Sequence, residues 1–164
     1  MITLVLGGSR SGKSEVGERL AARHDAPVTY IATGVVTDED FADRIERHRN
    51  RRPPEWDTVE LGRGGGLAAT LRSITGPVLV DSLGTWVAGT TDFAVDLDEL
   101  CAALVARHHP TIVVSDEVGM GVHPATEMGR AFRDALGNAN RRVADVAHEV
   151  LLVVAGRVLP LERP

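Results

Sequence analysis

The sequence has almost no lysine. Lys13 is the only one among 18 basic residues, and all the others are arginine. Cysteine is equally scarce: Cys101 stands alone, which excludes a disulfide framework and a cysteine-based metal cluster. The net charge of −5 argues against a general nucleic-acid binder.

Long apolar runs are also missing. None approaches the roughly 20 residues that a transmembrane helix needs. The chain starts directly with a strand pattern, and no signal peptide is visible. These absences predict a cytoplasmic protein without a membrane span.

The pattern of apolar residues predicts one α/β domain that covers residues 1–164. Expected strands are 2–6, 27–31, 78–81, 111–115, 150–154 and 157–159, and 56–60 could form an edge strand. Expected helices are one after residue 14, then 38–50, 67–74, 97–107 and 126–148, the last with a potential break near Gly137. Continuous apolar strands separated by helices predict a mostly parallel sheet covered on both faces, and the last two strands should form a hairpin.

The lone lysine lies in a phosphate-binding pattern. Residues 7–14 match G-x-x-x-x-G-K-[ST], the P-loop, which arises by chance in about one sequence per thousand of this length. A compact ammonium fits among phosphate oxygens where a planar guanidinium would be too wide. Because the loop joins an apolar strand to a helix, its backbone amides should point at the phosphates of a nucleoside triphosphate. The residues of this loop are Gly7, Gly8, Ser9, Arg10, Ser11, Gly12, Lys13 and Ser14.

A candidate magnesium site combines Ser14 with Asp81. P-loop enzymes hold Mg²⁺ with the Ser or Thr of the loop and with an acid at the end of a buried strand. Asp81 ends the apolar run 78–80, at the edge where α/β sheets place their ligands. The plainer interpretation is an aspartate that starts a turn.

A second acidic segment follows the strand expected at 111–115. Residues 115–124 contain Asp116 and Glu117, together with two glycines and a proline. The acids should lie at the ligand edge of the sheet, although a capped turn before the next helix would use the same residue types.

An arginine cluster surrounds His48. On the helix expected at 38–50, His48 shares the apolar face with Phe41 and Ile45, and arginines 44, 47, 49, 51 and 52 spread around it. Nearby cations favour neutral imidazole, the nucleophilic form, and the arginines could neutralise phosphates. The alternatives are a structural histidine within a core or interface, or a solvated basic face.

Taken together, these motifs resemble the bifunctional adenosylcobinamide kinase/adenosylcobinamide-phosphate guanylyltransferase family of cobalamin biosynthesis. The matching segments run in order along nearly the whole chain: 7–14, Tyr30-Ile31-Ala32-Thr33, residues 44–53 around His48, Asp116-Glu117-Val118-Gly119-Met120-Gly121, and residues 132–140.

The resemblance implies a RecA-like P-loop domain, a trimeric assembly and two reactions. ATP or GTP would phosphorylate adenosylcobinamide, and GTP would then guanylylate His48 and pass GMP to adenosylcobinamide phosphate, giving adenosylcobinamide-GDP. Catalysis would fall on His48, Lys13 and Asp81. Besides the P-loop, the implied nucleotide contacts are Ala32, Thr33, Gly34, Arg49, Asn50, Arg51, Arg52, Glu60, Asp81 and Glu117. Guanine preference rests on the resemblance alone, because the Asn-Lys-x-Asp signature of GTPases is absent.

Two other functions fit a P-loop. One is a kinase of another small molecule, with His48 structural. The other is a non-catalytic GTP-binding switch, which the lack of a long Gly/Thr switch loop disfavours.

Overall fold

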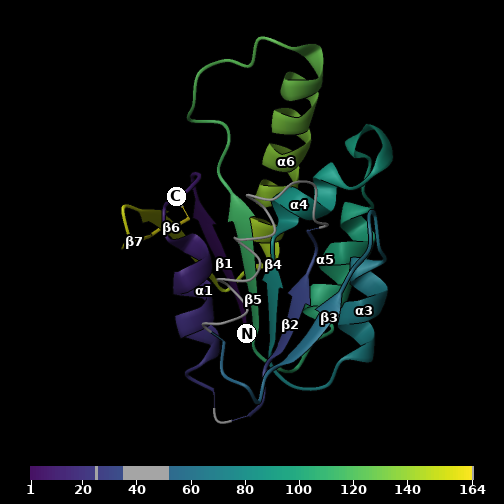
Figure 1. Cartoon of the computed structure of the whole chain (residues 1–164), viewed down its shortest axis with the longest axis vertical. Coiled ribbons are helices and arrows are strands. Elements are labelled where there is room, and N and C mark those ends of the chain that lie inside the picture. Colours follow the sequence, from purple (N-terminus) through teal and green to yellow (C-terminus); the bar gives the residue numbers. More distant parts are fainter. Residues whose placement is uncertain (25, 35–51, 164) are drawn as a thin grey trace.

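A computed structural model describes residues 1–24, 26–34 and 52–163, and it contains one seven-stranded sheet. The strands are β1 (Ile2–Gly7), β2 (Thr29–Ala32), β3 (Asp57–Glu60), β4 (Val78–Asp81), β5 (Thr111–Asp116), β6 (Glu149–Val154) and β7 (Arg157–Pro160). Their order across the sheet is β3-β2-β4-β5-β1-β6-β7. All neighbours are parallel except β6 and β7, which form an antiparallel hairpin (Figure 1). The predicted mostly parallel sheet with its final hairpin is confirmed.

Helices cover both faces of this sheet (Figure 1). They are α1 (Lys13–Ala21), α3 (Leu67–Ser73), α4 (Leu83–Ala88), α5 (Leu97–Val105) and α6 (Glu127–Val146), with a short 3-10 turn at Thr91–Phe93. One hydrophobic cluster joins the sheet to α1, and a second joins it to α3, α4, α5 and α6. The result is a three-layer α/β fold.

The central strands bury both of their faces, which explains their continuous apolar sequences. Along β4, Leu79 packs in the α1 cluster, while Val78 and Val80 pack in the opposite cluster. On β5, Val114 faces α1 and Val113 faces the other layer. Successive strand side chains point to opposite faces, so a strand between two helical layers needs apolar residues at every position.

Several expectations for the elements differ from the structure by more than one residue. The helix expected at 97–107 ends at Val105. The second strand begins at Thr29, two residues later than expected. The helix expected at 126–148 runs from Glu127 to Val146 without a break at Gly137. Helix α4 was not expected at all. The helix expected at 38–50 lies outside the described residues.

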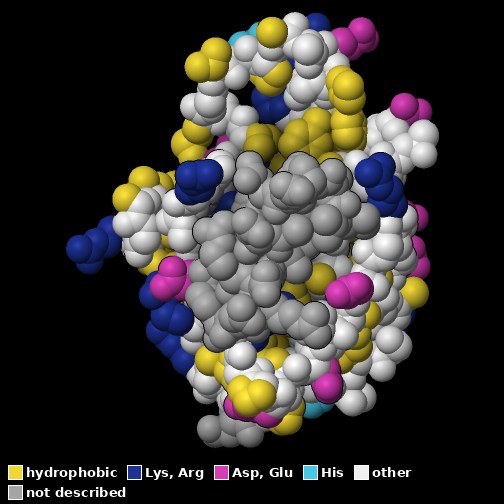
Figure 2. Space-filling view, viewed as in Figure 1, with side chains coloured by type: hydrophobic (Ala, Val, Ile, Leu, Met, Phe, Trp, Pro, Cys, Tyr) yellow, Lys and Arg dark blue, Asp and Glu magenta, His cyan; other side chains and the backbone are white. Residues whose placement is uncertain are grey.

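The carboxyl ends of the parallel strands share one edge of the sheet. Above this edge, α6 and the loop 117–126 extend beyond the strands (Figure 1). Figure 2 shows hydrophobic side chains gathered on this extension, where Met120, Val122 and Met128 are exposed. In the described part of the chain, no helix combines the length and apolar character needed to cross a bilayer.

Candidate active site

The loop between β1 and α1, residues 7–14, folds into a tight turn, which we call the cradle. Arg10 and Gly12 have φ angles of 57° and 92°, so the chain turns back on itself there. The Ser11 amide donates to the Gly8 carbonyl at 3.2 Å, which closes the turn. Such a turn at a helix N-terminus gathers backbone N–H groups around a space where an anion binds.

Lys13 is buried in the floor of this cradle, with 3% of its surface exposed. Its Nζ lies 3.4 Å from the Gly8 carbonyl oxygen and 2.6 Å from Asp116 Oδ1. A buried ammonium requires such partners, because removing it from water without them is costly. The lysine side chain therefore stays within the loop.

Ser14, Asp81 and Tyr30 form a second polar group beside Lys13. The Ser14 hydroxyl donates to Asp81 Oδ1 at 3.3 Å, and the Tyr30 hydroxyl donates to Asp81 Oδ2 at 2.8 Å. Burial, and then the charge of Asp81 and the hydrogen bond to it, raise the pKa of the Tyr30 phenol far above its ordinary value. Tyr30 is therefore a permanent donor that orients the carboxylate.

The residues around Asp81 fit a magnesium ion. A hydroxyl oxygen and a carboxylate oxygen from Ser14 and Asp81 are hard ligands that already lie together, and Mg²⁺ commonly takes one or two such ligands plus phosphate oxygens and water. Among the described residues, no group of three His, Cys, Asp or Glu side chains could hold a metal by itself. This donor set therefore suits a metal that arrives with a nucleotide.

Strand alternation places both acids on the face covered by α1. Asp81 lies two residues after Leu79, and Asp116 two after Val114, so each acid shares the face of the earlier residue. Helix α1 packs closely there: a side-chain carbon added at Gly17 would lie 2.8 Å from Val114. The cradle and the acids therefore meet above one face of the sheet.

The hairpin turn between β6 and β7 supports the cradle. Ala155 and Gly156 have φ angles of 50° and 73°, typical of a two-residue turn of type I′. The Gly156 amide donates to the Ser11 carbonyl at 2.8 Å, and a side-chain carbon added at Gly12 would lie 3.4 Å from Gly156 Cα. The end of the sheet therefore holds the P-loop in shape.

The predicted contacts at the end of β2 lie at the same edge. Ala32 pairs with both Glu60 and Asp81, so these three residues are level across neighbouring strands. Glu60 is exposed. The Thr33 hydroxyl donates to the Ser82 carbonyl at 2.6 Å, which ties β2 to the start of α4, and Gly34 follows it, half-buried.

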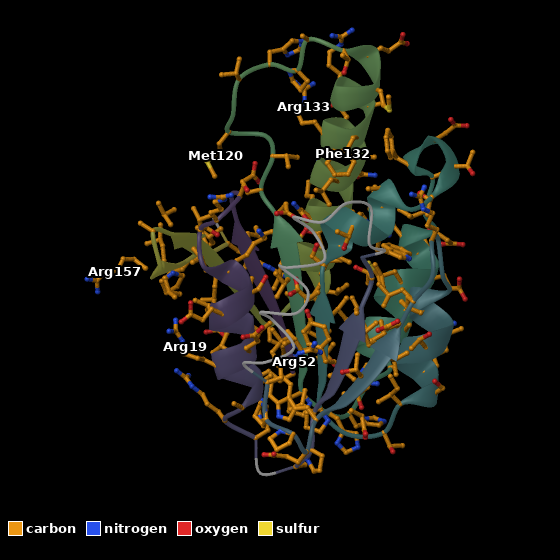
Figure 3. All side chains as sticks on the ribbon, in the orientation of Figure 1. Arg19, Arg52, Met120, Phe132, Arg133 and Arg157 are labelled. Atoms are coloured by element: carbon orange, nitrogen blue, oxygen red, sulfur yellow. The ribbon has the colours of Figure 1, made fainter. Side chains whose placement is uncertain are left out.

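Arg52 lies against Tyr30 above the sheet (Figure 3). Its guanidinium carbon is 3.8 Å from the centre of the tyrosine ring, and one guanidinium nitrogen donates to Thr58 Oγ1 at 3.1 Å. A cation stacked on the ring that orients Asp81 places Arg52 at the border of the site.

Glu117 has a different position from that of its neighbour Asp116. Its carboxylate accepts hydrogen bonds from the amides of Gly119 at 2.5 Å and Met120 at 3.2 Å, so it stabilises its own turn. Asp116, which the sequence interpretation did not single out as a nucleotide contact, is the acid that reaches Lys13. Strand alternation puts Asp116 on the same side as Val114, but the sequence does not show that α1 covers that side.

His48, Arg49, Asn50 and Arg51 lie outside the described residues, so their predicted roles stay predictions. The described part of the site comprises the P-loop, Lys13 with Asp116, and Ser14 with Asp81.

The fold and this cradle define a P-loop nucleotide-binding enzyme of the α/β class. The model of the family described as cobinamide kinase / cobinamide phosphate guanyltransferase matches residues 3–161, and the chain belongs to this family. Its function is therefore that of a bifunctional cobinamide kinase and cobinamide-phosphate guanylyltransferase in cobalamin biosynthesis. The family resemblance of the sequence is confirmed.

Individual relatives agree over nearly their full length. The chain is 39% identical to the bifunctional adenosylcobalamin biosynthesis protein CobP of Pseudomonas aeruginosa, covering 99% of this chain and 98% of the relative. It is 38% identical to the bifunctional adenosylcobalamin biosynthesis protein CobU of Salmonella typhimurium, covering 95% and 97%. The flagellar accessory protein FlaH from Methanocaldococcus jannaschii has a similar fold, with a TM-score of 0.54, 13% identity, and coverage of 96% of this chain and 74% of that one.

Proposed function

We propose that the P-loop cradle binds the triphosphate of ATP or GTP in the kinase reaction and of GTP in the guanylyl transfer. The observation that carries this proposal is the buried Lys13 ammonium at the floor of the loop, beside the pair formed by Ser14 and Asp81. Lys13 and the loop amides would neutralise the β- and γ-phosphates. The chain, which we take to be a single domain over residues 1–164, would thus use one nucleotide site for both reactions.

We propose that Ser14 and Asp81 hold Mg²⁺ together with the phosphates. When bound, the ion supplies charge neutralisation across the β- and γ-oxygens. Tyr30 keeps the Asp81 carboxylate turned so that Oδ1 faces Ser14. The remaining implied contacts, Ala32, Thr33, Gly34, Arg52 and Glu60, would line the nucleotide from the β2 side.

In the kinase reaction, the acceptor hydroxyl of adenosylcobinamide would attack the γ-phosphorus. The bond from that phosphorus to the β–γ bridging oxygen breaks, and the nucleoside diphosphate leaves. Such a transfer requires alignment and charge neutralisation more than covalent chemistry from the protein. The Lys13 ammonium and the loop amides are suited to that task.

For the guanylyl transfer, we infer from the family resemblance that a nitrogen of His48 attacks the α-phosphorus of GTP. Pyrophosphate leaves, and a phosphate oxygen of adenosylcobinamide phosphate then displaces His48 and takes the GMP. A covalent intermediate divides one difficult displacement into two easier ones. Arg49, Asn50 and Arg51 would contact the nucleotide. The two arginines would stabilise charge on the phosphorus oxygens and on pyrophosphate.

One labelling experiment tests both steps. The protein is incubated with GTP labelled at the α-phosphate or at the γ-phosphate, with and without cobinamide. We expect an acid-labile, base-stable protein adduct from the α-label alone, and γ-label in cobinamide phosphate.

The adduct should disappear in His48→Ala and persist in His109→Ala, an exposed histidine before the amino end of β5, the edge opposite the P-loop. An adduct that survives in His48→Ala would contradict the role of His48. If γ-label is transferred and no adduct forms, the protein acts as a kinase only. If neither the adduct nor the transfer is detected, the protein is a nucleotide-binding module without either activity.

We also propose a homo-oligomer, with a trimer as the state that the family resemblance implies. Edge strand β7 supports this proposal, because Val158 and Leu159 are 45% and 57% exposed. An apolar sheet edge is normally covered by another chain or element. Light scattering coupled to size-exclusion chromatography measures the mass, and a particle of 17.5 kDa would contradict the proposal.

A further inference from the structure

Asp116 is the acid closest to the lysine of the cradle. Its Oδ1 is 2.6 Å from Lys13 Nζ, and the two side chains are 29% and 4% exposed. Because Lys13 is shielded from water, the attraction between these two charges is screened less than in a surface ion pair. Nothing else in the cradle's described residues brings a carboxylate oxygen as close to that ammonium.

The fold holds Asp116 from several sides. Register places it opposite Gly7, the first residue of the P-loop. The Asn140 side-chain amide donates to the Asp116 carbonyl at 3.0 Å, and Asn140 is itself buried. The Ser82 hydroxyl donates to Oδ2 at 3.4 Å.

Helix α4 leaves space for this carboxylate. A side-chain carbon added at Gly84 would lie 2.5 Å from Asp116 Oδ2, so only glycine fits without displacing the acid. One oxygen therefore faces α4 while the other faces Lys13.

The same ammonium must serve the triphosphate. Phosphate oxygens and the Asp116 carboxylate compete for Lys13, and they repel each other because both are negative. We propose that Asp116 is a positioning residue for the transfer reactions: it holds Lys13 aimed into the cradle, at the cost of weaker binding of the nucleotide ground state. A site that restrains ground-state binding while fixing a transition-state donor favours turnover over tight binding.

The substitution Asp116→Asn tests this proposal, which rests on the kinase activity of the family. Asparagine keeps the shape and the bond with Ser82 but removes the charge. We expect the dissociation constant of a GTP analogue with a non-hydrolysable β–γ bridge to fall about threefold to tenfold, since the phosphates would then be the only anions for a buried cation. The kcat for cobinamide phosphorylation should fall at least about tenfold, because the ammonium loses its fixed position.

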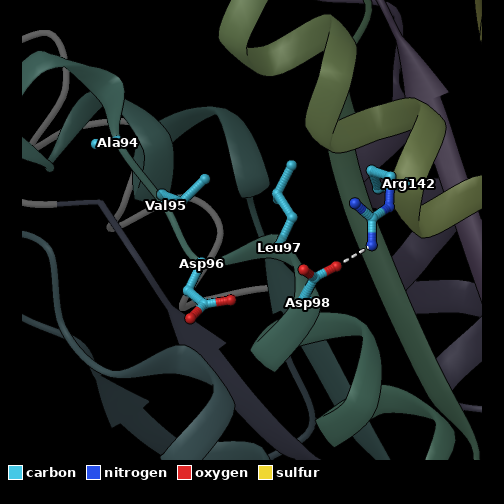
Figure 4. Close-up of a pocket in the computed structure, with 6 residues that line it drawn as sticks. All are labelled: Ala94, Val95, Asp96, Leu97, Asp98 and Arg142. Atoms are coloured by element: carbon cyan, nitrogen blue, oxygen red, sulfur yellow. Dashed lines mark hydrogen bonds and ion pairs between the residues drawn. The ribbon is translucent and has the colours of Figure 1, made fainter.

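A matched control is Asp98→Asn. Asp98 forms an ion pair with Arg142 beside an open hollow of about 530 Å³ at the start of α5 (Figure 4). The same chemical change there should leave the dissociation constant and kcat within twofold of those of the unchanged protein. If the unchanged protein shows no kinase turnover, the family function is contradicted for this chain. Calorimetric titration with the GTP analogue then still tests whether Asp116 weakens nucleotide binding.

If the analogue binds more tightly while kcat falls, Asp116 positions Lys13, because general damage to the site would weaken both binding and turnover. A variant that binds the analogue more weakly and turns over more slowly, or that changes neither, overturns the proposal. In a Lys13→Ala background, Asp116→Asn should reduce kcat no further, since no ammonium is left to position. Additive losses would show that Asp116 acts on the substrate directly and would also overturn it.

A second variant covers the case in which Asp116→Asn does not fold. Gly84→Ala keeps the charge but displaces Oδ2, and it should lower kcat at least several-fold. A folded Gly84→Ala protein with unchanged kcat contradicts the proposal.

Discussion

At the residue scale, Lys13 shows why one lysine persists among 17 arginines. Its ammonium lies between the Gly8 carbonyl and Asp116, and only 3% of the Lys13 surface is exposed. Arginine has a longer side chain and a planar fork that this space does not match. We therefore predict that Lys13→Arg lowers kcat for both transfers at least about a hundredfold, the effect of losing one transition-state donor.

Steady-state kinetics with cobinamide and with cobinamide phosphate measure this loss. The reverse exchange, Arg19→Lys, is the control. Arg19 forms an exposed pair with Glu15 on α1, at 3.4 Å, and such pairs contribute little. Activity of Lys13→Arg close to that of the unchanged protein would contradict the steric argument.

Tyr30 predicts how stability depends on pH. Burial and Asp81 raise its pKa in the folded state, whereas the unfolded chain releases the proton near the ordinary tyrosine pKa of about 10. Above that pH the unfolded state binds fewer protons than the folded state, so the free energy of unfolding falls as pH rises. The loss should approach about 1.4 kcal/mol per pH unit.

Urea unfolding between about pH 8 and about pH 11 measures this slope. Tyr30→Phe should lack this contribution, although losing the hydrogen bond to Asp81 costs it about 1–2 kcal/mol at neutral pH. Because Tyr30 is the only tyrosine, tyrosinate absorbance should appear together with unfolding. Tyrosinate forming near pH 10 in the folded protein would contradict the structure's account.

At the element scale, helices α6 and α1 carry glycines in different surroundings. A side-chain carbon added at Gly137 of α6 meets nothing within 4 Å, while one added at Gly17 of α1 lies 2.8 Å from Val114. We predict that Gly137→Ala stabilises the protein by about 0.5–1 kcal/mol, because α6 is continuous and alanine favours a helix.

The same substitution at Gly17 should instead destabilise the protein by about 1–3 kcal/mol, through overpacking against the sheet. Chemical denaturation of both variants provides the comparison. If Gly137→Ala destabilises the protein, Gly137 must be in close contact with something other than the residues that the structure describes.

Elements buried on both faces were predictable, and a short helix was not. The strands containing Val78 to Val80 and Ile112 to Val114 have apolar runs that only a covered sheet explains. Helix α4 has six residues, with Gly84 and Val87 among them, and too few turns for a periodic pattern. Ser82 caps the start of this helix by accepting a hydrogen bond from the Thr85 amide. The position of Ser82 depends in turn on its contact with Thr33, which follows the neighbouring strand β2.

Parts of the site followed from spacing, and others required the packed structure. The P-loop pattern gave Lys13 and Ser14, and the end of a buried strand gave Asp81. The choice between Asp116 and Glu117 depends on which face of β5 carries α1, because adjacent strand residues point in opposite directions. The sequence motif shows both acids, but it does not show which face of β5 is covered by α1.

At the scale of the whole molecule, the nucleotide should stabilise the fold. A ligand that binds only the folded state adds about 2.7 kcal/mol to the free energy of unfolding at a hundred times its dissociation constant. We predict a gain of this size with saturating GTP and Mg²⁺. The gain should be smaller when a chelator removes the Mg²⁺ that we propose Ser14 and Asp81 hold. Thermal unfolding with each addition measures it, and Lys13→Ala should lose most of the effect.

An equal gain in Lys13→Ala would show that the nucleotide binds elsewhere on the protein. Serial dilution of GTP in the same assay provides the control, because the gain must follow ligand concentration.

The position of β1 also determines when the protein can first bind nucleotide during its synthesis. Ile2 pairs with Thr111 on one side, and Thr3 pairs with Glu149 on the other, so β1 is made long before either of its neighbours. The cradle that follows β1 is tied to Gly156 as well. Pairings this distant in sequence form slowly and late. The P-loop therefore leaves the ribosome before β5 and β6 do, and it takes its final shape only after both strands have paired with β1.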